Sequence, residues 1–347
     1  MEAHGSYNRN SRVQAAGLLP AVQLFEHAAA RAALALDPEP ILIADYGSSA
    51  GHNSLAPVRQ AIQTLRKRTG RERAISVVHT DLPSNDFSGL FELLDTNPES
   101  YLTGDPQVFV SAVGRSFYRP LLPLGSVTLG WSSWAVQWLS QIPGVIGDHV
   151  QVACSQNTAA RQAFASTAAA DWEAFLTCRA DELRPGGRLV VLTMALDEEG
   201  NFGYGPLLDA MYDGLKALVA EGLISPEELR RMVIPTIGRS CADLSAPFQA
   251  TGTFAGLSIE HLEVFSAEDR IWAEFEADSD ARAFGAKWAA FPRASVFPTL
   301  ASSLDGGGND PRSAAFFEGL EARLAATLTL EPKRMMIPLA KLALVRV

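Results

Sequence analysis

One stretch of the sequence decides the fold: Ile41-Leu42-Ile43-Ala44-Asp45, followed at once by Tyr46-Gly47-Ser48-Ser49-Ala50-Gly51. Its first half is a short apolar run bounded by turn residues, which is typical of a strand buried in a parallel sheet. In the second half, Gly47 lets the backbone turn tightly and Gly51 lets a ligand approach it closely. Open parallel sheets bind ligands at the carboxyl ends of their strands, so we expect a binding site directly after Asp45.

The chain up to about residue 199 alternates strand patterns with helix patterns. Further strands are predicted at 74–79, 107–113, 125–130 and 188–194. Helices are predicted at 13–36, from residue 54 or 57 to about 68, and at about 168–183. Strands that alternate with helices indicate an α/β fold with a mostly parallel sheet.

Residues 200–320 have a different character, because helix patterns there are separated by breaks rich in glycine and proline. The predicted helices are 206–221, 226–232, 279–290 and 312–328. We interpret this region as a largely helical cap over the core of residues 1–199, whose N-terminal part forms a lid. A strand near 258–265 could interleave the cap with the core sheet. Residues 321–347 are expected to return to that sheet, with 335–347 as a final edge strand.

The charge balance disfavours nucleic acid as a partner. Lys and Arg number 29 against 39 Asp and Glu, which gives a net charge of -10. Binding to phosphates requires clustered basic residues. The densest basic stretch, Arg66-Lys67-Arg68, is short and is best interpreted as a solvated helix end.

The cysteines and the apolar runs indicate the cellular environment in which we expect the protein. Cys154, Cys178 and Cys241 are few, odd in number and without a CxxC spacing, which argues against disulfides and against a cysteine-bound metal. We expect a reducing, cytoplasmic environment and no metal. Residues 1–12 are polar and do not resemble a signal peptide, and no run of eighteen apolar residues predicts a membrane span.

The absence of two common nucleotide-binding motifs narrows the range of ligands that we expect. The chain contains neither the G-x-G-x-x-G fingerprint of dinucleotide-binding folds nor a G-x-x-x-x-G-K-[ST] phosphate loop. The second predicted strand is followed by Asp81, a carboxylate that can bind both ribose hydroxyls of a nucleoside, although an ordinary helix N-cap is the alternative. A glycine turn without a diphosphate motif, together with a ribose-binding acid, favours a nucleoside that carries no phosphate, such as S-adenosylmethionine.

Six blocks of sequence follow one another in a familiar order. They are YNRNSRVQ (7–14), IADYGSSAGHNS (43–54), DLPSNDF (81–87), SFY (116–118), SSWAVQWLSQIP (132–143) and FLTCRADELRPGGR (175–188). In this arrangement the chain resembles the SABATH methyltransferases. This family includes the salicylate, benzoate, jasmonate and indole-acetate carboxyl methyltransferases and the caffeine-pathway N-methyltransferases, and a bacterial type of fatty acid O-methyltransferase would also be compatible. Beyond residue 200 the match is looser.

The resemblance implies a Rossmann-like methyltransferase fold with a seven-stranded, mostly parallel sheet, S-adenosylmethionine as cofactor, and a homodimer. It implies that Gln14 and Trp138 hydrogen-bond the carboxylate of the substrate and that Trp134 forms a wall of the substrate pocket. The residues expected at the cofactor, with Gly47 added for its turn, are Tyr7, Ser11, Asp45, Gly47, Asn53, Asp81, Leu82, Ser116 and Phe117.

The expected reaction converts a small apolar carboxylic acid, aromatic or a medium-chain fatty acid, to its methyl ester. A carboxylic acid with a pKa of about 4 is ionised at neutral pH, so no general base is required. Gln14 and Trp138 are neutral donors that could orient the carboxylate, and such alignment can contribute about 7–11 kcal/mol. Trp134 and Trp138 are four residues apart and would share one face of a helix.

Two alternatives remain open from the sequence. Methylation of a ring nitrogen in a heterocycle is one, but it would not need paired donors directed at a carboxylate. The other is a catalytically silent protein that only binds S-adenosylmethionine. A nicotinamide-dependent dehydrogenase is disfavoured by the missing glycine fingerprint.

Overall fold

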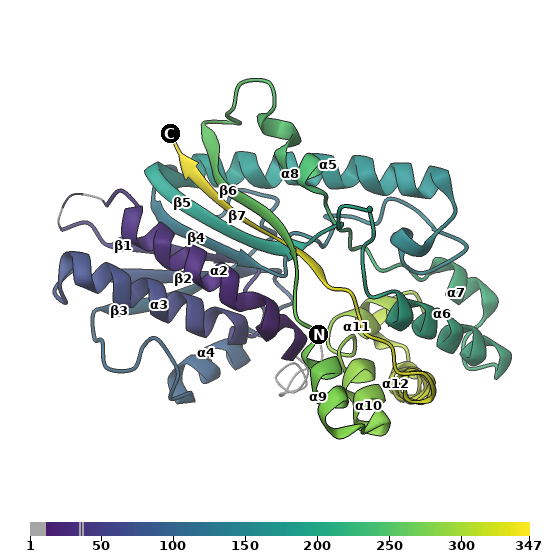
Figure 1. Cartoon of the computed structure of the whole chain (residues 1–347). Coiled ribbons are helices and arrows are strands. Elements are labelled where there is room, and N and C mark those ends of the chain that lie inside the picture. Colours follow the sequence, from purple (N-terminus) through teal and green to yellow (C-terminus); the bar gives the residue numbers. More distant parts are fainter. Residues whose placement is uncertain (1–11, 35, 37) are drawn as a thin grey trace.

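The computed structural model describes residues 12–34, 36 and 38–347, and it is built around one seven-stranded sheet (Figure 1). The strands are β1 Ile41–Tyr46, β2 Ile75–Asp81, β3 Val108–Gly114, β4 Val127–Ser133, β5 Leu183–Met194, β6 Leu257–Ser266 and β7 Pro338–Arg346. Their order across the sheet is β3-β2-β1-β4-β5-β7-β6. The pairs among β1 to β5 are parallel, and β7 is antiparallel to both of its neighbours. The predicted Rossmann-like, mostly parallel sheet is therefore confirmed.

Strand β1 shows why the sheet is buried on both faces. Ile41 and Ile43 belong to the cluster that also contains Phe25 of helix α2 Arg12–Arg31. Ala44 and Tyr46 belong to a second cluster, with Phe175 of helix α5 Thr158–Glu182. Side chains alternate between the two faces of a strand, so the apolar run of β1 supplies both clusters.

Helices cover both faces of the sheet, as Figure 1 shows for α2 and for α3 His52–Thr69 on one face and α5 on the other. Helix α4 Phe87–Thr96 follows β2. The remaining helices are α6 Gly205–Ala220, α7 Pro226–Arg231, α8 Cys241–Ser245, α9 Arg270–Asp278, α10 Ala281–Ala290, α11 Val296–Ala301 and α12 Ser313–Leu330. They are inserted between β5 and β6 and between β6 and β7, and α12 packs against both α6 and α10.

The structure corrects the predicted position of the last strand and the predicted ends of two helices. The last strand is not an edge strand, because β7 lies between β5 and β6, and β6 forms the edge. Helix α5 begins at Thr158, ten residues before the predicted start, because the side chain of Asn157 caps it by accepting the Ala160 N–H. Helix α2 ends at Arg31 and does not continue to residue 36.

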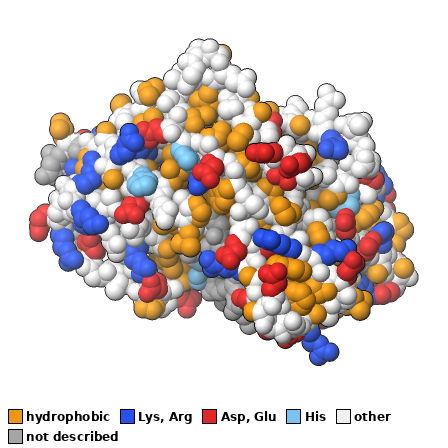
Figure 2. Space-filling model, viewed as in Figure 1, with side chains coloured by type: hydrophobic (Ala, Val, Ile, Leu, Met, Phe, Trp, Pro, Cys, Tyr) orange, Lys and Arg blue, Asp and Glu red, His pale blue; other side chains and the backbone are white. Residues whose placement is uncertain are grey.

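None of the described helices combines the length and the apolar character that crossing a bilayer would require. On the face shown in Figure 2, basic side chains are interspersed with acidic ones.

Candidate active site

A cavity of about 370 Å³ lies where the carboxyl ends of the parallel strands meet the segments inserted between β5 and β6 and between β6 and β7. From the sheet side it is lined by Gly47, Ser49, Asp81, Leu82, Phe117, Trp134 and Trp138, among others. From these inserted segments it is lined mainly by apolar side chains such as Phe202, Leu207, Leu208, Met211, Phe291 and Val296. One continuous space therefore joins the strand ends to an apolar chamber.

The turn after β1 requires glycine at position 47. Gly47 has a φ of 87°, in the left-handed region that other residues rarely adopt. A Cβ atom there would lie 2.3 Å from the Cβ of Ala135, in the segment that follows β4. The backbone N–H groups of Gly47 and Ser48 both donate to the carbonyl of Thr80. The turns after β1, β2 and β4 are therefore packed directly against one another.

Asp81 connects the turns after β1 and β2. Its Oδ2 accepts the Ser49 N–H and its Oδ1 accepts the Leu82 N–H, each at 2.7 Å. Burial raises the pKa of Asp81, and these two hydrogen bonds partly offset that effect. Each carboxylate oxygen has a second lone pair, so both can still accept a hydroxyl of a bound ligand. Asp81 and Leu82 line the cavity, as the interpretation of Asp81 as a ribose-binding residue requires.

Asp45 lies behind this turn, in a buried network. Its Oδ2 accepts the Ser54 hydroxyl at 2.5 Å and lies 2.7 Å from Nδ1 of His79. Because a carboxylate only accepts, Nδ1 of His79 donates to it, and in the neutral imidazole Nε2 accepts the hydroxyl of Tyr101 at 2.6 Å. Asp45 is 1% exposed and, like Asn53 in the first turn of α3, it is not among the described residues that line the cavity. Direct contact of these two residues with the cofactor stays a prediction.

Ser116 and Phe117 reach the cavity from the loop after β3, and a buried arginine holds that loop in place. Arg179 in α5 donates to the carbonyl of Phe117 at 2.8 Å and to that of Arg119 at 3.2 Å. Its guanidinium also pairs with Glu182 at 2.7 Å. This explains the place of Arg179 in the block at 175–188, although Arg179 itself does not line the cavity.

Trp134 and Trp138 both line the cavity, but not from a helix. Trp134 has a φ of 56°, and β4 ends just before it. The backbone N–H of Trp138 donates to the carbonyl of Ala135 in a tight turn. Trp138 then pairs with Thr236 in an antiparallel bridge. The prediction of a shared helix face was therefore wrong, because the chain leaves the strand through a left-handed residue that no helix pattern reveals.

The N-terminal site residues cannot be placed in the cavity. Gln14 lies in α2, where residues 12–17 are described by their backbone alone. Tyr7 and Ser11 lie outside the described residues. The proposed convergence of Gln14 and Trp138 on one carboxylate thus stays a prediction.

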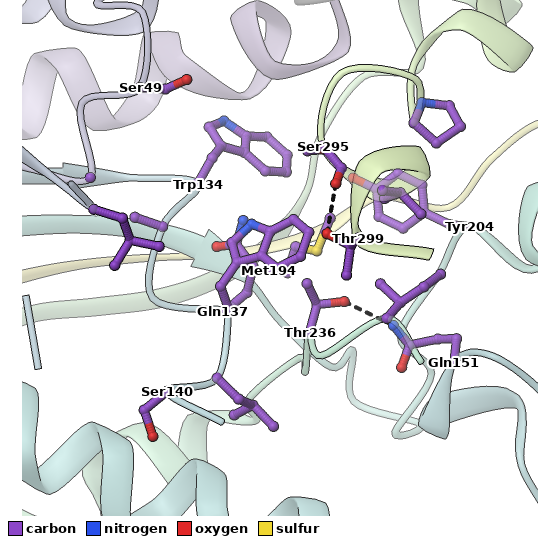
Figure 3. Close-up of a pocket in the computed structure, with 18 of the residues that line it drawn as sticks. Ser49, Trp134, Gln137, Ser140, Gln151, Met194, Tyr204, Thr236, Ser295 and Thr299 are labelled. Carbon is purple, nitrogen blue, oxygen red and sulfur yellow. Dashed lines mark hydrogen bonds between the residues drawn. The ribbon is translucent and has the colours of Figure 1, made fainter. Parts of the chain in front are cut away.

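Gln137, Gln151 and Thr236 are among the polar residues of the cavity wall that were missed (Figure 3). Gln137 precedes Trp138, and its carboxamide oxygen accepts the hydroxyl of Thr193 at 3.2 Å. Gln151 donates to the hydroxyl of Thr236 at 2.9 Å. Gln137 could have been suspected from its position between two tryptophans. Gln151 and Thr236 are 85 residues apart, so no local pattern could bring them together.

Outside the cavity, His149, Cys154 and Asp209 place possible ligand atoms within 4.8 Å of one another. Nδ1 of His149 accepts the Gln151 N–H at 3.0 Å, so the neutral imidazole carries its proton on Nε2. Burial also lowers the pKa of His149. Neither ring nitrogen then offers a free lone pair to a cation, and we assign no metal to this cluster.

These features fit a nucleoside cofactor without phosphate groups. Gly47 lines the cavity without a side chain, Asp81 keeps free acceptor capacity, and Leu82 and Phe117 provide apolar surface beside them. The described residues of the turn after β1 include no lysine that could bind a phosphate.

Comparison with known proteins gives a consistent result. A family model described as SAM dependent carboxyl methyltransferase matches residues 2–342. Salicylate carboxymethyltransferase of Clarkia breweri is 31% identical over 250 residues, which cover 69% of this chain and 67% of that protein. The benzoic acid/salicylic acid carboxyl methyltransferase 3 of Petunia hybrida is 30% identical over 262 residues, which cover 72% of this chain and 73% of that protein.

Among solved structures, loganic acid methyltransferase with SAH matches with a TM-score of 0.79 at 22% identity, over 100% of this chain and 98% of that one. At this identity the match shows the fold alone. The family model and the two sequence relatives go further. The chain belongs to the S-adenosylmethionine-dependent carboxyl methyltransferases, the SABATH family that its sequence blocks resemble, with S-adenosylmethionine as methyl donor.

Proposed function

We propose that this enzyme methylates the carboxylate of a small apolar acid, either an aromatic acid or a medium-chain fatty acid. The observation that carries the proposal is the continuous cavity from Gly47 and Asp81, through Trp134 and Trp138, into the apolar chamber under the cap. A ligand that is polar at one end and apolar at the other fits such a space. The relatives named for salicylate and benzoic acid act on acids of this kind.

The bound cofactor supplies a methyl group activated by a positively charged sulfur. The protein has to hold the acid beside it, and we propose Trp138, which lines the cavity, for this role. Its main-chain carbonyl accepts the hydroxyl of Tyr118 at 2.6 Å, which fixes the residue, while its indole N–H makes no hydrogen bond with another described residue. We propose that this N–H donates to one carboxylate oxygen and that Gln14 donates to the other.

The cap contributes by excluding water. Phe202, Leu208 and Met211 form part of the chamber wall and are each at most 6% exposed. A hydrogen bond to a charged group is stronger where water is excluded, because the local dielectric constant is low. Neutral donors orient the carboxylate without the full positive charge of Lys or Arg, which would reduce its nucleophilicity. We propose that residues 200–320 form this cap, that residues 1–199 form the cofactor-binding core and that residues 321–347 return to the sheet.

The decisive experiment is a methyl-transfer screen over a panel of carboxylic acids, with mass spectrometry of the esters. The panel contains benzoate derivatives, indole-acetate and straight-chain acids, together with xanthine-type heterocycles as N-methyl acceptors. We expect methyl esters from at least one acid and no N-methylated product. Tight cofactor binding without any ester would contradict the proposal and favour a silent binder, and N-methylation alone would favour the heterocycle alternative.

We further propose a cytoplasmic homodimer with a small-molecule substrate and no nucleic-acid partner. The three cysteines are all free, which suits a reducing compartment, and the net charge of -10 disfavours nucleic acid. The dimer rests on the family resemblance. Light scattering after size-exclusion chromatography should give twice the mass of the chain, and the mass of a single chain would refute it.

A further inference from the structure

A second cavity of about 250 Å³ lies beside the substrate pocket. Helix α5 lines it with Ala165, Ala168 and Trp172, and the segment before α8 lines it with Ile237 and Arg239. Gln151 lines both this cavity and the substrate pocket. The side chain of Gln151 therefore stands at the boundary between two spaces.

Gln151 is held at three points. Its backbone N–H donates to Nδ1 of His149 at 3.0 Å, and its carboxamide oxygen accepts the N–H of Ala153 at 3.3 Å. The carboxamide nitrogen donates to the hydroxyl of Thr236 at 2.9 Å, as the dashed line in Figure 3 shows. Gln151 is 1% exposed. Moving this side chain away would cost free energy, because it is buried and both the oxygen and the nitrogen of its amide are hydrogen-bonded.

The boundary is thin. Thr236 lines the substrate pocket, whereas Ile237 lines the second cavity. Successive side chains of an extended segment point to opposite sides, and Thr236 is extended where it pairs with Trp138. One stretch of backbone and the side chain of Gln151 therefore separate the two cavities.

We propose that Gln151 is a specificity-determining residue: its side chain closes the substrate pocket against the second cavity and so limits the size of the acid that the enzyme accepts. This inference rests on the proposed function, because it concerns the acid of that same reaction. Without the side chain beyond Cβ, the two spaces would join. The enlarged pocket would take acids that carry an additional apolar group, which would lie against the alanines of α5.

The test is the size profile of Gln151→Ala, measured as kcat/KM for homologous acids that gain one methylene at a time, as straight-chain acids and as alkyl-substituted benzoates. For the wild type we expect kcat/KM to stop rising at a limiting size. For Gln151→Ala we expect kcat/KM to keep rising beyond the limiting size of the wild type, by about fourfold for each further methylene that is buried. An unchanged limit would overturn the proposal.

Two further variants separate the size of the side chain from its hydrogen bonds. Gln151→Leu keeps the bulk and loses the polar contacts, so it should retain the limit of the wild type. The double variant Gln151→Ala with Ala165→Leu refills the second cavity from an exposed position of α5 and should restore that limit. A Gln151→Leu profile like that of Gln151→Ala, or a double variant that keeps the extended profile, would contradict the proposal.

Calorimetric binding of the same acids, with S-adenosylhomocysteine present, provides a readout that does not depend on methyl transfer. If the wild type forms no ester from any acid, the proposed function fails, while the binding profiles still decide the role of Gln151. If esters form and the profiles of wild type and Gln151→Ala coincide in both assays, only the role of Gln151 fails.

Discussion

Arg179 and Glu182 form an ion pair shielded from water, with Nη2 of the arginine 2.7 Å from Oε1 of the glutamate and side-chain exposures of 0% and 1%. Glu182 also accepts the N–H of Leu121 at 2.7 Å and the hydroxyl of Tyr46 at 2.9 Å. Arg179 binds the carbonyl of Phe117. The pair thus anchors to helix α5 the loop that carries Phe117 into the cavity.

Replacing Arg179 should show what this pair contributes. Arg179→Met leaves Glu182 buried without its cation, and we expect the free energy of unfolding to fall by about 3–5 kcal/mol. The KM for S-adenosylmethionine should rise as well, because the loop with Phe117 loses its anchor. Urea denaturation and steady-state kinetics measure the two effects. The matched control is Arg230→Met, which breaks an exposed pair with Glu227; equal losses in both variants would argue against a special role of Arg179.

The indole N–H of Trp138 should matter more than the bulk of its ring. Trp138→Phe keeps an aromatic side chain and removes the donor, so kcat/KM for the acid should fall about 10- to 100-fold, the effect of losing one hydrogen bond to a charged group. The melting temperature should change little. Trp272→Phe, in the apolar packing of α9, is the control for general tryptophan loss. Full activity of Trp138→Phe would exclude this residue as a carboxylate donor.

Gly47 should tolerate no side chain, for two separable reasons. Gly47→Ala adds the strain of a positive φ, about 1–2 kcal/mol, and a clash with Ala135. Gly222→Ala has a comparable φ of 76° but meets no atom within 4 Å, so it isolates the strain. We expect Gly47→Ala to be the less stable of the two and to bind S-adenosylhomocysteine much more weakly by calorimetry. Equal melting temperatures and equal cofactor binding of the two variants would show that the turn after β1 can accommodate a side chain at position 47.

Glu228 should make the stability of the cap depend on pH. The guanidinium of Arg312, with the backbone N–H groups of Ser225 and Asp305, lowers the pKa of Glu228 from 4.5 to about 2. A lowered pKa in the folded state stabilises the protein above the unfolded value, by up to about 3 kcal/mol, and this contribution disappears as the pH falls from 4.5 through about 2.

The measurement is urea unfolding of wild type and Glu228→Gln at several pH values. The stability difference should be largest at neutral pH and should shrink steadily below pH 4.5. Glu227→Gln, one residue away and largely exposed, should show far less dependence on pH. A stability difference for Glu228→Gln that does not change with pH would rule out the proposed charge effect.

Much of the core could be predicted from local sequence. The apolar run of β1 and the Gly47 turn are local signals, since the strand needs apolar side chains on both faces and the turn needs a positive φ. Asp81 could be placed at the cavity because it stands at the carboxyl end of the next strand. The surroundings of Asp45 could not be foreseen, because His79 meets Asp45 only once β1 and β2 are paired, and Tyr101 reaches His79 from a later segment of the chain.

The substrate half of the site was much less accessible to prediction. Its wall is assembled from residues such as Gln151, Tyr204, Thr236 and Phe291, which lie in different connecting segments of the chain. Local periodicity reports which face of a helix is buried, but not which helices meet. Trp138 was identified through its sequence block, whereas the backbone that presents it depends on the left-handed conformation of Trp134.

The position of β7 has a consequence for how the chain folds. Strands β5 and β6 do not touch each other directly; each pairs with β7, which follows both in the sequence. Until residues 338–346 have been synthesised, both strands present open backbone edges, and such edges promote aggregation. The sheet can therefore be completed only after residues 338–346 have joined the chain, and until then these two edges are exposed to pairing with other molecules.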